Sequence, residues 1–239
     1  ATVVEVPLKD GVHDLQAMGE RITDRTKIVW LCNPNNPTGT FVTRAELVRF
    51  LDAVPSRVMV VLDEAYFEYA DDPEYPDGIA LLPRYPNLLV LRTFSKIYGL
   101  ASLRIGYGVA HANVIRIVNQ VRQPFNTSRF AQTAAIAALG DLEFVRRCKE
   151  ANRQGLKTLG EAFDRMGLKP FPSQANFIFV DVQRDAKDVF QRLLQRGIIV
   201  RAGFPGFPTG VRITVGTPEQ NEKLLAALEA VLHEVKVQV

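Results

Sequence analysis

The sequence has little of several features that mark particular classes of protein. No apolar run approaches the roughly 18 residues of a membrane-spanning helix, and the first residues lack the basic start and long apolar core of a signal peptide. Cysteine occurs twice in 239 residues, as Cys32 and Cys148. Two distant cysteines do not suggest a disulfide framework and favour a reducing compartment. We therefore expect a cytoplasmic protein with no membrane partner.

Blocks of charge and nucleotide-binding motifs are also missing. The 29 basic and 26 acidic residues are mixed along the chain and leave a net charge of +3, which favours no nucleic-acid partner but permits small anionic ligands. The sequence has no P-loop and no G-x-G-x-x-G after an apolar run, which argues against nucleoside triphosphates and dinucleotides. The three histidines, His13, His111 and His233, lack ligand spacing, so we expect no metal site.

Short apolar runs in the first half predict the strands of an α/β fold. These runs do not alternate with polar residues, which is typical of strands buried on both faces. They are Val3–Val6, Ile28–Leu31, Val58–Leu62, Leu88–Leu91 and Ile105–Val109. Thr43 and Glu46 have capping-box spacing, so a helix is expected between the second and third runs, in a βαβ unit. We expect a mostly parallel central sheet flanked by helices.

The second half predicts a smaller α/β domain. Helical patterning dominates from about 128 to 166 and should stop near Gly167. Further strands are expected at Asn176–Val180, Ile198–Val200 and Val211–Val215. A last helix should begin after Thr217, with its apolar stripe formed by Leu224, Leu225, Leu228, Val231, Leu232 and Val235. We expect residues 1–140 to be part of a large domain and residues 141–239 to form a small C-terminal domain.

Polar side chains follow three of the predicted strands. Asp63 and Tyr66 come after Val58–Leu62, and Lys96 follows Leu88–Leu91. Asn36 lies after Ile28–Leu31, in a loop that two prolines make rigid. Since open α/β sheets bind ligands beyond the carboxyl ends of their strands, we expect these side chains to share one site.

Each of these side chains, taken alone, fits a more ordinary role. A single Asp at a strand end is more often a structural ion-pair partner or helix cap, and a single Tyr more often lies at the edge of a core with its hydroxyl satisfied. The loop of Asn36 also fits a tight turn without a ligand, Lys96 a solvated loop lysine, and Arg104 a surface ion pair. It is the whole set, in this order, that indicates a ligand site.

The set matches the needs of pyridoxal phosphate. Asp63 would pair with the ring nitrogen, and Tyr66 would donate to the ring oxygen. Asn36 could donate both to the ring oxygen and to a substrate carboxylate. Desolvation and nearby cations would make Lys96 nucleophilic enough to form a Schiff base with the aldehyde. The hydroxyls of Ser95 and Thr93 and the guanidinium of Arg104 would form a cradle for the phosphate.

Four motifs carry a resemblance to a known family. They are Asn33-Pro-Asn-Asn-Pro-Thr-Gly39, Asp63-Glu-Ala-Tyr66, Thr93-Phe-Ser-Lys96 with Arg104, and Val211-Arg-Ile-Thr-Val-Gly216. The sequence resembles the fold-type I pyridoxal phosphate-dependent aminotransferases, and among them the histidinol-phosphate aminotransferases, from about Val3 to the C-terminus. The resemblance implies a homodimer that exchanges an amino group between histidinol phosphate or imidazole acetol phosphate and glutamate or 2-oxoglutarate, in histidine biosynthesis.

The resemblance also implies roles for individual residues. Lys96 would hold the cofactor and carry the proton during the reaction, and Asp63 would pair with the pyridine nitrogen. Tyr66 and Asn36 would contact the ring oxygen, while Ser95, Arg104 and Thr93 would bind the phosphate. Arg212 would bind the substrate carboxylate, with Arg201 as a second candidate. Ile97 departs from the small residue usual after the lysine, but this position supplies no reacting group.

Two alternatives stay open at this stage. Pyridoxal phosphate stabilises more than one kind of carbanion, so a decarboxylase of the same fold that acts on a phosphorylated amino acid has an equal claim on these motifs. The family also carries a front segment, ahead of the part matched by Ala1, that supplies a ring-stacking aromatic residue and contacts to the phosphate and to the neighbouring subunit. An inactive fragment or binding remnant is therefore the other alternative.

Overall fold

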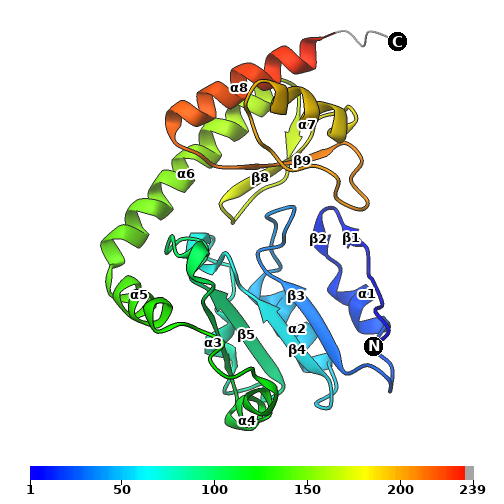
Figure 1. Cartoon of the computed structure of the whole chain (residues 1–239). Coiled ribbons are helices and arrows are strands. Elements are labelled where there is room, and N and C mark those ends of the chain that lie inside the picture. Colours follow the sequence, from blue (N-terminus) through cyan, green and yellow to red (C-terminus); the bar gives the residue numbers. More distant parts are fainter. Residues whose placement is uncertain (235–239) are drawn as a thin grey trace. The chain divides into compact units, whose positions relative to one another are not determined.

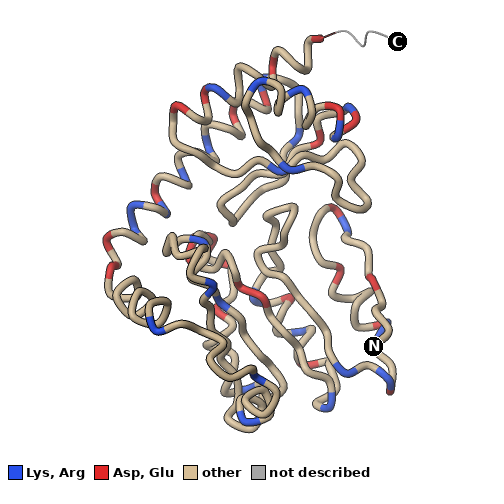
Figure 2. The backbone as a smooth tube through the Cα atoms, viewed as in Figure 1, with Lys and Arg blue, Asp and Glu red and all other residues tan. Residues whose placement is uncertain are grey.

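The computed structural model describes residues 1–234, which fall into two compact units (Figure 1). Unit 1 comprises Ala1–Asn36 and Thr40–Cys148, and unit 2 comprises Pro37–Gly39 and the chain from Lys149 onward. The domain boundary expected after residue 140 falls at the end of helix α5 (Arg129–Gly140). Basic and acidic residues are interspersed along both units (Figure 2). No helix among the described residues is both long and apolar enough to cross a membrane.

Unit 1 is built on a mostly parallel sheet. Within the described residues its strand order is β3-β4-β5-β6, formed by Ile28–Cys32, Met59–Asp63, Leu88–Thr93 and Gly106–Ala110. The pairs β3–β4 and β4–β5 are parallel, whereas β6 runs antiparallel to β5. The predicted fold class and four of the predicted strands are confirmed, with bounds shifted by one or two residues.

Helices and a short hairpin complete unit 1. Their bounds are β1 Leu8–Lys9, β2 Val12–His13, α1 Leu15–Glu20, α2 Arg44–Ala53, α3 Gly78–Leu81, α4 Ala112–Val121 and α5, with 3-10 turns at Phe67–Tyr69 and Ala101–Leu103. Helix α2 starts as predicted, because Thr43 accepts from the Glu46 N–H and the Glu46 carboxylate accepts from the Thr43 N–H. The strand expected at Val3–Val6 is wrong: this run forms no regular structure and both Val3 and Val4 are exposed.

The core of unit 1 lies on one face of the sheet. Val29, Leu31, Val60, Leu62, Leu88 and Val90 pack there against Leu47, Phe50 and Leu51 of α2. Each such side chain contributes on the order of 1.5–3 kcal/mol by burial. On the other face of β3, Ile28 is 51% and Trp30 is 60% exposed. The expectation that every strand is buried on both faces is therefore wrong for β3, an edge strand whose side chains alternate between core and solvent.

Unit 2 contains a smaller antiparallel sheet and three helices. Its strand order within the described residues is β7-β8-β9, formed by Lys169–Pro170, Phe177–Asp181 and Gly210–Thr214. The helices are α6 (Leu142–Arg165), which begins in unit 1, α7 (Ala186–Gln195) and α8 (Pro218–His233). The strand expected at Ile198–Val200 is wrong, since this run forms no strand and the next residue, Arg201, makes an isolated bridge to Arg212.

The end of α6 and the start of α8 lie where the sequence predicts them. Gly167 follows α6 with a φ of +72°, a conformation that costs a side chain strain but suits glycine. Thr217 and Gln220 form the capping box that starts α8. The buried residues of α6 and α8 include Leu159, Phe163, Leu224, Leu228 and Val231, which join one core with β8 and β9. The last member of the predicted α8 stripe, Val235, lies outside the described residues.

Candidate active site

The carboxyl ends of β3, β4 and β5 lie at one edge of the unit 1 sheet. Cys32 pairs with Asp63 in the register of β3 and β4, and Asp63 pairs with Leu91 in the register of β4 and β5. Because these strands are parallel, the segments that follow them emerge at the same edge. The sequence therefore brings the residues after Cys32, Asp63 and Thr93 to one place.

Asp63 is the last residue of β4, and its side chain is only partly exposed. Its Oδ1 accepts a hydrogen bond from the Ala65 N–H at 3.1 Å. Burial raises the pKa of Asp63, while the Ala65 N–H and the charge of Lys96 act in the opposite direction. A carboxylate in this setting is stabilised by a cationic partner, which is what a protonated pyridine nitrogen would provide.

Lys96 and Tyr66 meet at the same place. The Nζ atom of Lys96 lies 5.3 Å from the centroid of the Tyr66 ring, which is within the range of a cation–π interaction. The Tyr66 side chain is buried, and Ile97 next to the lysine is also buried. Asp63, Tyr66 and Lys96, which the sequence assigned to one ligand, are therefore neighbours in space.

Thr93, Ser95 and Arg104 form a second group beside Lys96. The Ser95 N–H donates to Thr93 Oγ1 at 3.0 Å. One guanidinium nitrogen of Arg104 lies 3.5 Å from Ser95 Oγ and donates to the Ala101 carbonyl at 2.7 Å. Arg104 is exposed and has a φ of +53°, a left-handed conformation that is strained for a side-chain-bearing residue. A hydroxyl, a guanidinium and a strained turn suit an anion such as a phosphate.

The loop that carries Asn36 is held by its own polar groups. The Asn33 N–H donates to the Asp63 carbonyl at 2.9 Å, and the Asn33 side chain exchanges hydrogen bonds with the backbone of Val42. Asn35 N–H donates to the Thr40 carbonyl at 2.7 Å. Asn33 and Asn35 are buried, whereas Asn36 is exposed. The loop therefore presents Asn36 from a rigid base that is bonded to the end of β4.

Cys32 directly precedes this loop, and a cysteine thiol can act as a nucleophile once it is ionised. Burial raises the pKa of its thiol to about 12, and the nearby Asp63 carboxylate adds to this shift. A thiol that stays protonated at neutral pH is a poor nucleophile, so we assign Cys32 no role in the proposed chemistry.

Two of the three substrate-binding candidates, Arg212 and Arg201, belong to unit 2, whereas Asn36 belongs to unit 1. Arg212 on β9 and Arg201 exchange backbone hydrogen bonds of 3.0 and 2.8 Å. The guanidinium carbon of Arg212 lies 5.0 Å from the Phe177 ring centroid and 5.7 Å from that of Phe204. Aromatic faces on this guanidinium hold it in one orientation. The carboxylate-binding role of both arginines stays a prediction.

A buried ion-pair cluster beside the site was not assigned a role from the sequence. Glu64 is fully buried and accepts from Arg92 Nε and from the Gly78 N–H, both at 2.8 Å. Arg92 also contacts Asp77 at 2.7 Å. Burial raises the pKa of Glu64 to about 7, although Arg92 and the Gly78 N–H oppose this. The signal in the sequence is a glutamate two residues after one apolar run and an arginine directly after another, since buried charges need partners.

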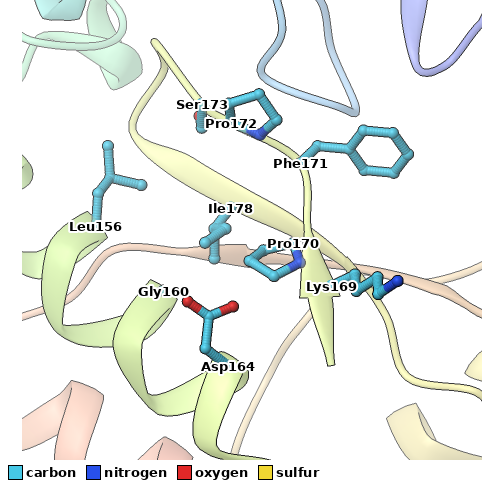
Figure 3. A pocket seen from close by; sticks show the side chains of 9 residues that line it. All are labelled: Leu156, Gly160, Asp164, Lys169, Pro170, Phe171, Pro172, Ser173 and Ile178. Atoms are coloured by element: carbon cyan, nitrogen blue, oxygen red, sulfur yellow. The ribbon is translucent and has the colours of Figure 1, made fainter. Parts of the chain in front are cut away.

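The structure also shows a hollow in unit 2, and its lining includes none of the site residues described above. It encloses about 440 Å³ between α6 and the β7–β8 pair (Figure 3). Its lining residues are Leu156, Gly160, Asp164, Lys169, Pro170, Phe171, Pro172, Ser173 and Ile178. The Ser173 hydroxyl is already bonded to the Phe177 carbonyl. None of the predicted site residues lines this hollow, so we place the candidate active site at the strand ends of unit 1.

Comparisons with known proteins agree with the family resemblance drawn from the four sequence motifs. The family model described as aminotransferase class I and II matches residues 1–228. The chain is 56% identical over 233 residues to histidinol-phosphate aminotransferase of Brevibacillus brevis, an alignment that covers 97% of this chain and 64% of that protein. The chain thus spans less than two thirds of the length of this relative.

Solved structures of similar fold include members of the same family. Histidinol-phosphate aminotransferase of Sinorhizobium meliloti, in complex with pyridoxal-5'-phosphate, has a TM-score of 0.89 and 34% identity, covering 96% of this chain and 64% of that chain. L-threonine-O-3-phosphate decarboxylase of Porphyromonas gingivalis has a TM-score of 0.78 and 27% identity, covering 91% and 68%. The resemblance drawn from the four motifs is confirmed, the fold is that of fold-type I aminotransferases, and the chain belongs to the aminotransferase class I and II family.

Proposed function

We propose that this protein is a pyridoxal phosphate-dependent aminotransferase that exchanges an amino group between histidinol phosphate or imidazole acetol phosphate and glutamate or 2-oxoglutarate. The observation that carries the proposal is the placement of Lys96 over the Tyr66 ring, with Asp63 in electrostatic contact. An amine, a phenol and a partly buried carboxylate at one strand edge are what this cofactor requires.

The residues present fit the cofactor. Asp63 would hold the ring nitrogen in its protonated form, since burial raises the pKa of this carboxyl and a cation beside it would favour its ionised form. Ser95, Thr93 and Arg104 would take the phosphate, because their hydroxyls and guanidinium already lie together. Tyr66 and Asn36 would reach the ring oxygen. When bound, the cofactor supplies an electron sink for a carbanion.

The protein's own groups would then manage charge and protons. Lys96 would hold the cofactor through Nζ and, once displaced by the substrate amine, would accept and return a proton at that atom. Asp63 would keep the ring nitrogen charged, which strengthens the electron sink. Arg212, with Arg201 as the second candidate, would bind the carboxylate of glutamate or 2-oxoglutarate by a bidentate contact.

Support for the substrate comes from the relatives. The Brevibacillus brevis protein, 56% identical, and the Sinorhizobium meliloti structure both carry the name histidinol-phosphate aminotransferase. A chain this similar to the former is expected to share its substrate class, and histidine biosynthesis in the cytoplasm follows as part of the proposal.

We further propose that the protein is a homodimer. Unit 1 exposes a series of large apolar side chains on and between α4 and α5: Ile117, Val118, Val121, Phe125, Phe130, Ile136 and Leu139. Large apolar side chains left exposed in this number support association with a second copy of the chain. Sedimentation equilibrium should show a dimer, and Phe130→Asp should shift it toward monomer. Leu194→Asp on α7, also at an exposed leucine, should leave the dimer intact.

A decarboxylase is the second candidate. Its support is the structural similarity to L-threonine-O-3-phosphate decarboxylase of Porphyromonas gingivalis. The same set of Asp63, Lys96 and Arg104 serves either reaction, since both begin by stabilising a carbanion. Carbon dioxide release from a phosphorylated amino acid, without any requirement for a keto acid, would favour this candidate over the aminotransferase.

The proposed function is tested by cofactor capture. The purified chain is titrated with pyridoxal phosphate, reduced with borohydride and mapped by peptide mass, and amino transfer from histidinol phosphate to 2-oxoglutarate is assayed. We expect the label on Lys96 and loss of both label and turnover in Lys96→Ala. Lys27→Ala, an exposed lysine just before β3 in the same unit, is the matched control and should behave like the unmutated chain. Wild-type turnover in Lys96→Ala would refute the assignment.

A further inference from the structure

A cluster of buried charge joins the two strand ends that carry Asp63 and Lys96. Glu64 directly follows Asp63, and Arg92 lies on β5, four residues before Lys96. The Glu64 carboxylate and the Arg92 guanidinium are in contact at 2.8 Å, and their side chains are 0% and 9% exposed. This contact, together with Asp77 and the ring of Phe67, is called the Glu64 cluster below.

A backbone hydrogen bond also joins the ends of β4 and β5. The Glu64 N–H donates to the Leu91 carbonyl at 2.8 Å, so the pairing of β4 with β5 extends one residue beyond Asp63. The other oxygen of Glu64 accepts from the Gly78 N–H. A Cβ at Gly78 would lie 2.7 Å from that oxygen and 2.6 Å from the Leu62 side chain. Helix α3 therefore starts in close contact with the carboxylate and holds it from the other side.

Arg92 is fully engaged by the protein. Its guanidinium carbon lies 3.4 Å from the centroid of the Phe67 ring, and one of its nitrogens contacts Asp77 at 2.7 Å. Burial lowers the pKa of Arg92, but Glu64 and Asp77 raise it by more, so the net shift is upward. Arg92 is thus a cation that the fold uses internally, unlike the exposed Arg104.

The Glu64 cluster adjoins three of the predicted cofactor contacts along the chain, Asp63, Tyr66 and Thr93. Glu64 is next to Asp63 in the sequence, and Phe67 is next to Tyr66. Arg92 donates to the carboxylate of Glu64, which directly follows the neighbouring strand β4, and Arg92 precedes the segment from Thr93 to Lys96. A side-chain bond between two strand ends fixes their separation, and small errors in such placement reduce catalysis.

We propose that Glu64 and Arg92 are positioning residues, whose buried contact holds the ends of β4 and β5 so that Asp63 and Lys96 face one cofactor. The inference rests on the proposed function for the identity of that cofactor. Neither residue is assigned a contact with the cofactor or the substrate.

Hydrogen exchange without cofactor is the first part of the test. In Glu64→Gln and in Arg92→Met, peptides covering residues 63–67 and 93–98 should exchange about tenfold faster, because the side-chain bond between the strand ends is weakened. The first residues of β4 and β5 should keep their protection. Asp77→Asn, which alters the partly exposed edge of the cluster, should act in the same direction and serves if a buried variant does not fold.

Cofactor binding is the second part. Both buried variants should bind pyridoxal phosphate about tenfold more weakly, as is typical when residues that orient a binding group are removed. The pH at which the visible absorbance of the bound cofactor changes should also shift, since that pH depends on the placement of Asp63 relative to Lys96. Arg92→Lys keeps the charge but loses the forked contact, so it should restore only part of the affinity.

Leu88→Ala is the control for a merely structural role. Leu88 is buried at the other end of β5, away from the cluster, so its loss should lower stability without changing the absorbance titration. If Glu64→Gln resembles Leu88→Ala in exchange at 93–98 and in the titration, positioning is excluded. If the unmutated chain takes up no cofactor, the proposed function fails, while the exchange experiment still decides whether the cluster orders the strand ends.

Discussion

The amine of Lys96 lies 5.3 Å from the centroid of the buried Tyr66 ring. The two residues come from different strand ends, so the register of β4 and β5 is what brings them together. The face of the aromatic ring makes a cation–π contact with the lysine amine. The hydroxyl has a separate role in the proposed site, as a donor to the ring oxygen of the cofactor. Substitutions at Tyr66 can therefore separate the two contributions.

Tyr66→Phe keeps the ring and removes the hydroxyl. We expect this variant to fold normally and to bind pyridoxal phosphate several-fold more weakly, since one hydrogen bond contributes about 1 kcal/mol. Tyr66→Ala should instead lower the free energy of unfolding by about 3 kcal/mol, the size of a large aromatic deletion from a core. Absorbance titration and urea unfolding measure the two effects. Equal cofactor affinity in Tyr66→Phe and the unmutated chain would remove the hydroxyl from the site.

Asp63→Asn should separate stability from activity. The folded state raises the pKa of Asp63, so holding this side chain ionised at neutral pH costs folding free energy. Asparagine removes that cost and can still accept the Ala65 N–H. We expect the cofactor-free variant to be at least as stable as the unmutated chain in urea, while amino transfer falls by roughly 10²-fold or more. Undiminished turnover would show that Asp63 does not serve the ring nitrogen.

The upward pKa shift of Glu64 predicts that the free energy of unfolding depends on pH, with a definite sign. Its pKa is raised from 4.5 to about 7 on folding, so between these values the folded chain keeps a proton that the unfolded chain releases. The contribution of this group is therefore fully present below pH 4.5 and is lost as the pH rises toward 7. The difference in unfolding free energy between the unmutated chain and Glu64→Gln should fall across this window. A difference that is constant or rises with pH would contradict the assignment.

The features that the sequence predicted well are those set by local residues. The capping boxes at Thr43 and Thr217 and the glycine stop at Gly167 depend on a few neighbouring side chains, and all three appear as expected. The strands that precede Tyr66 and Lys96 are predicted correctly because short apolar runs without polar alternation are typical of buried strands.

The features that the sequence predicted poorly depend on distant partners. A strand exists only when another strand pairs with it, so neither Val3–Val6 nor Ile198–Val200 follows from an apolar run alone. The antiparallel direction of β6 and the exposed face of β3 are likewise set by packing. The contact of Glu64 with Arg92 spans 28 residues of sequence, and no local pattern pairs them.

The exposed face of β3 can be observed directly, because Trp30 is the one tryptophan in the sequence. Its side chain is 60% exposed, although it lies in a strand. We expect red-shifted emission in the folded chain and efficient quenching by iodide, close to the values in urea. The unfolding transition followed by this fluorescence should then be small, while circular dichroism shows the full transition. Trp30→Phe should barely change the free energy of unfolding, whereas Leu31→Ala, the neighbouring residue on the buried face, should lower it by about 2–5 kcal/mol. Blue-shifted, quencher-resistant emission would mean that another surface covers β3 in solution.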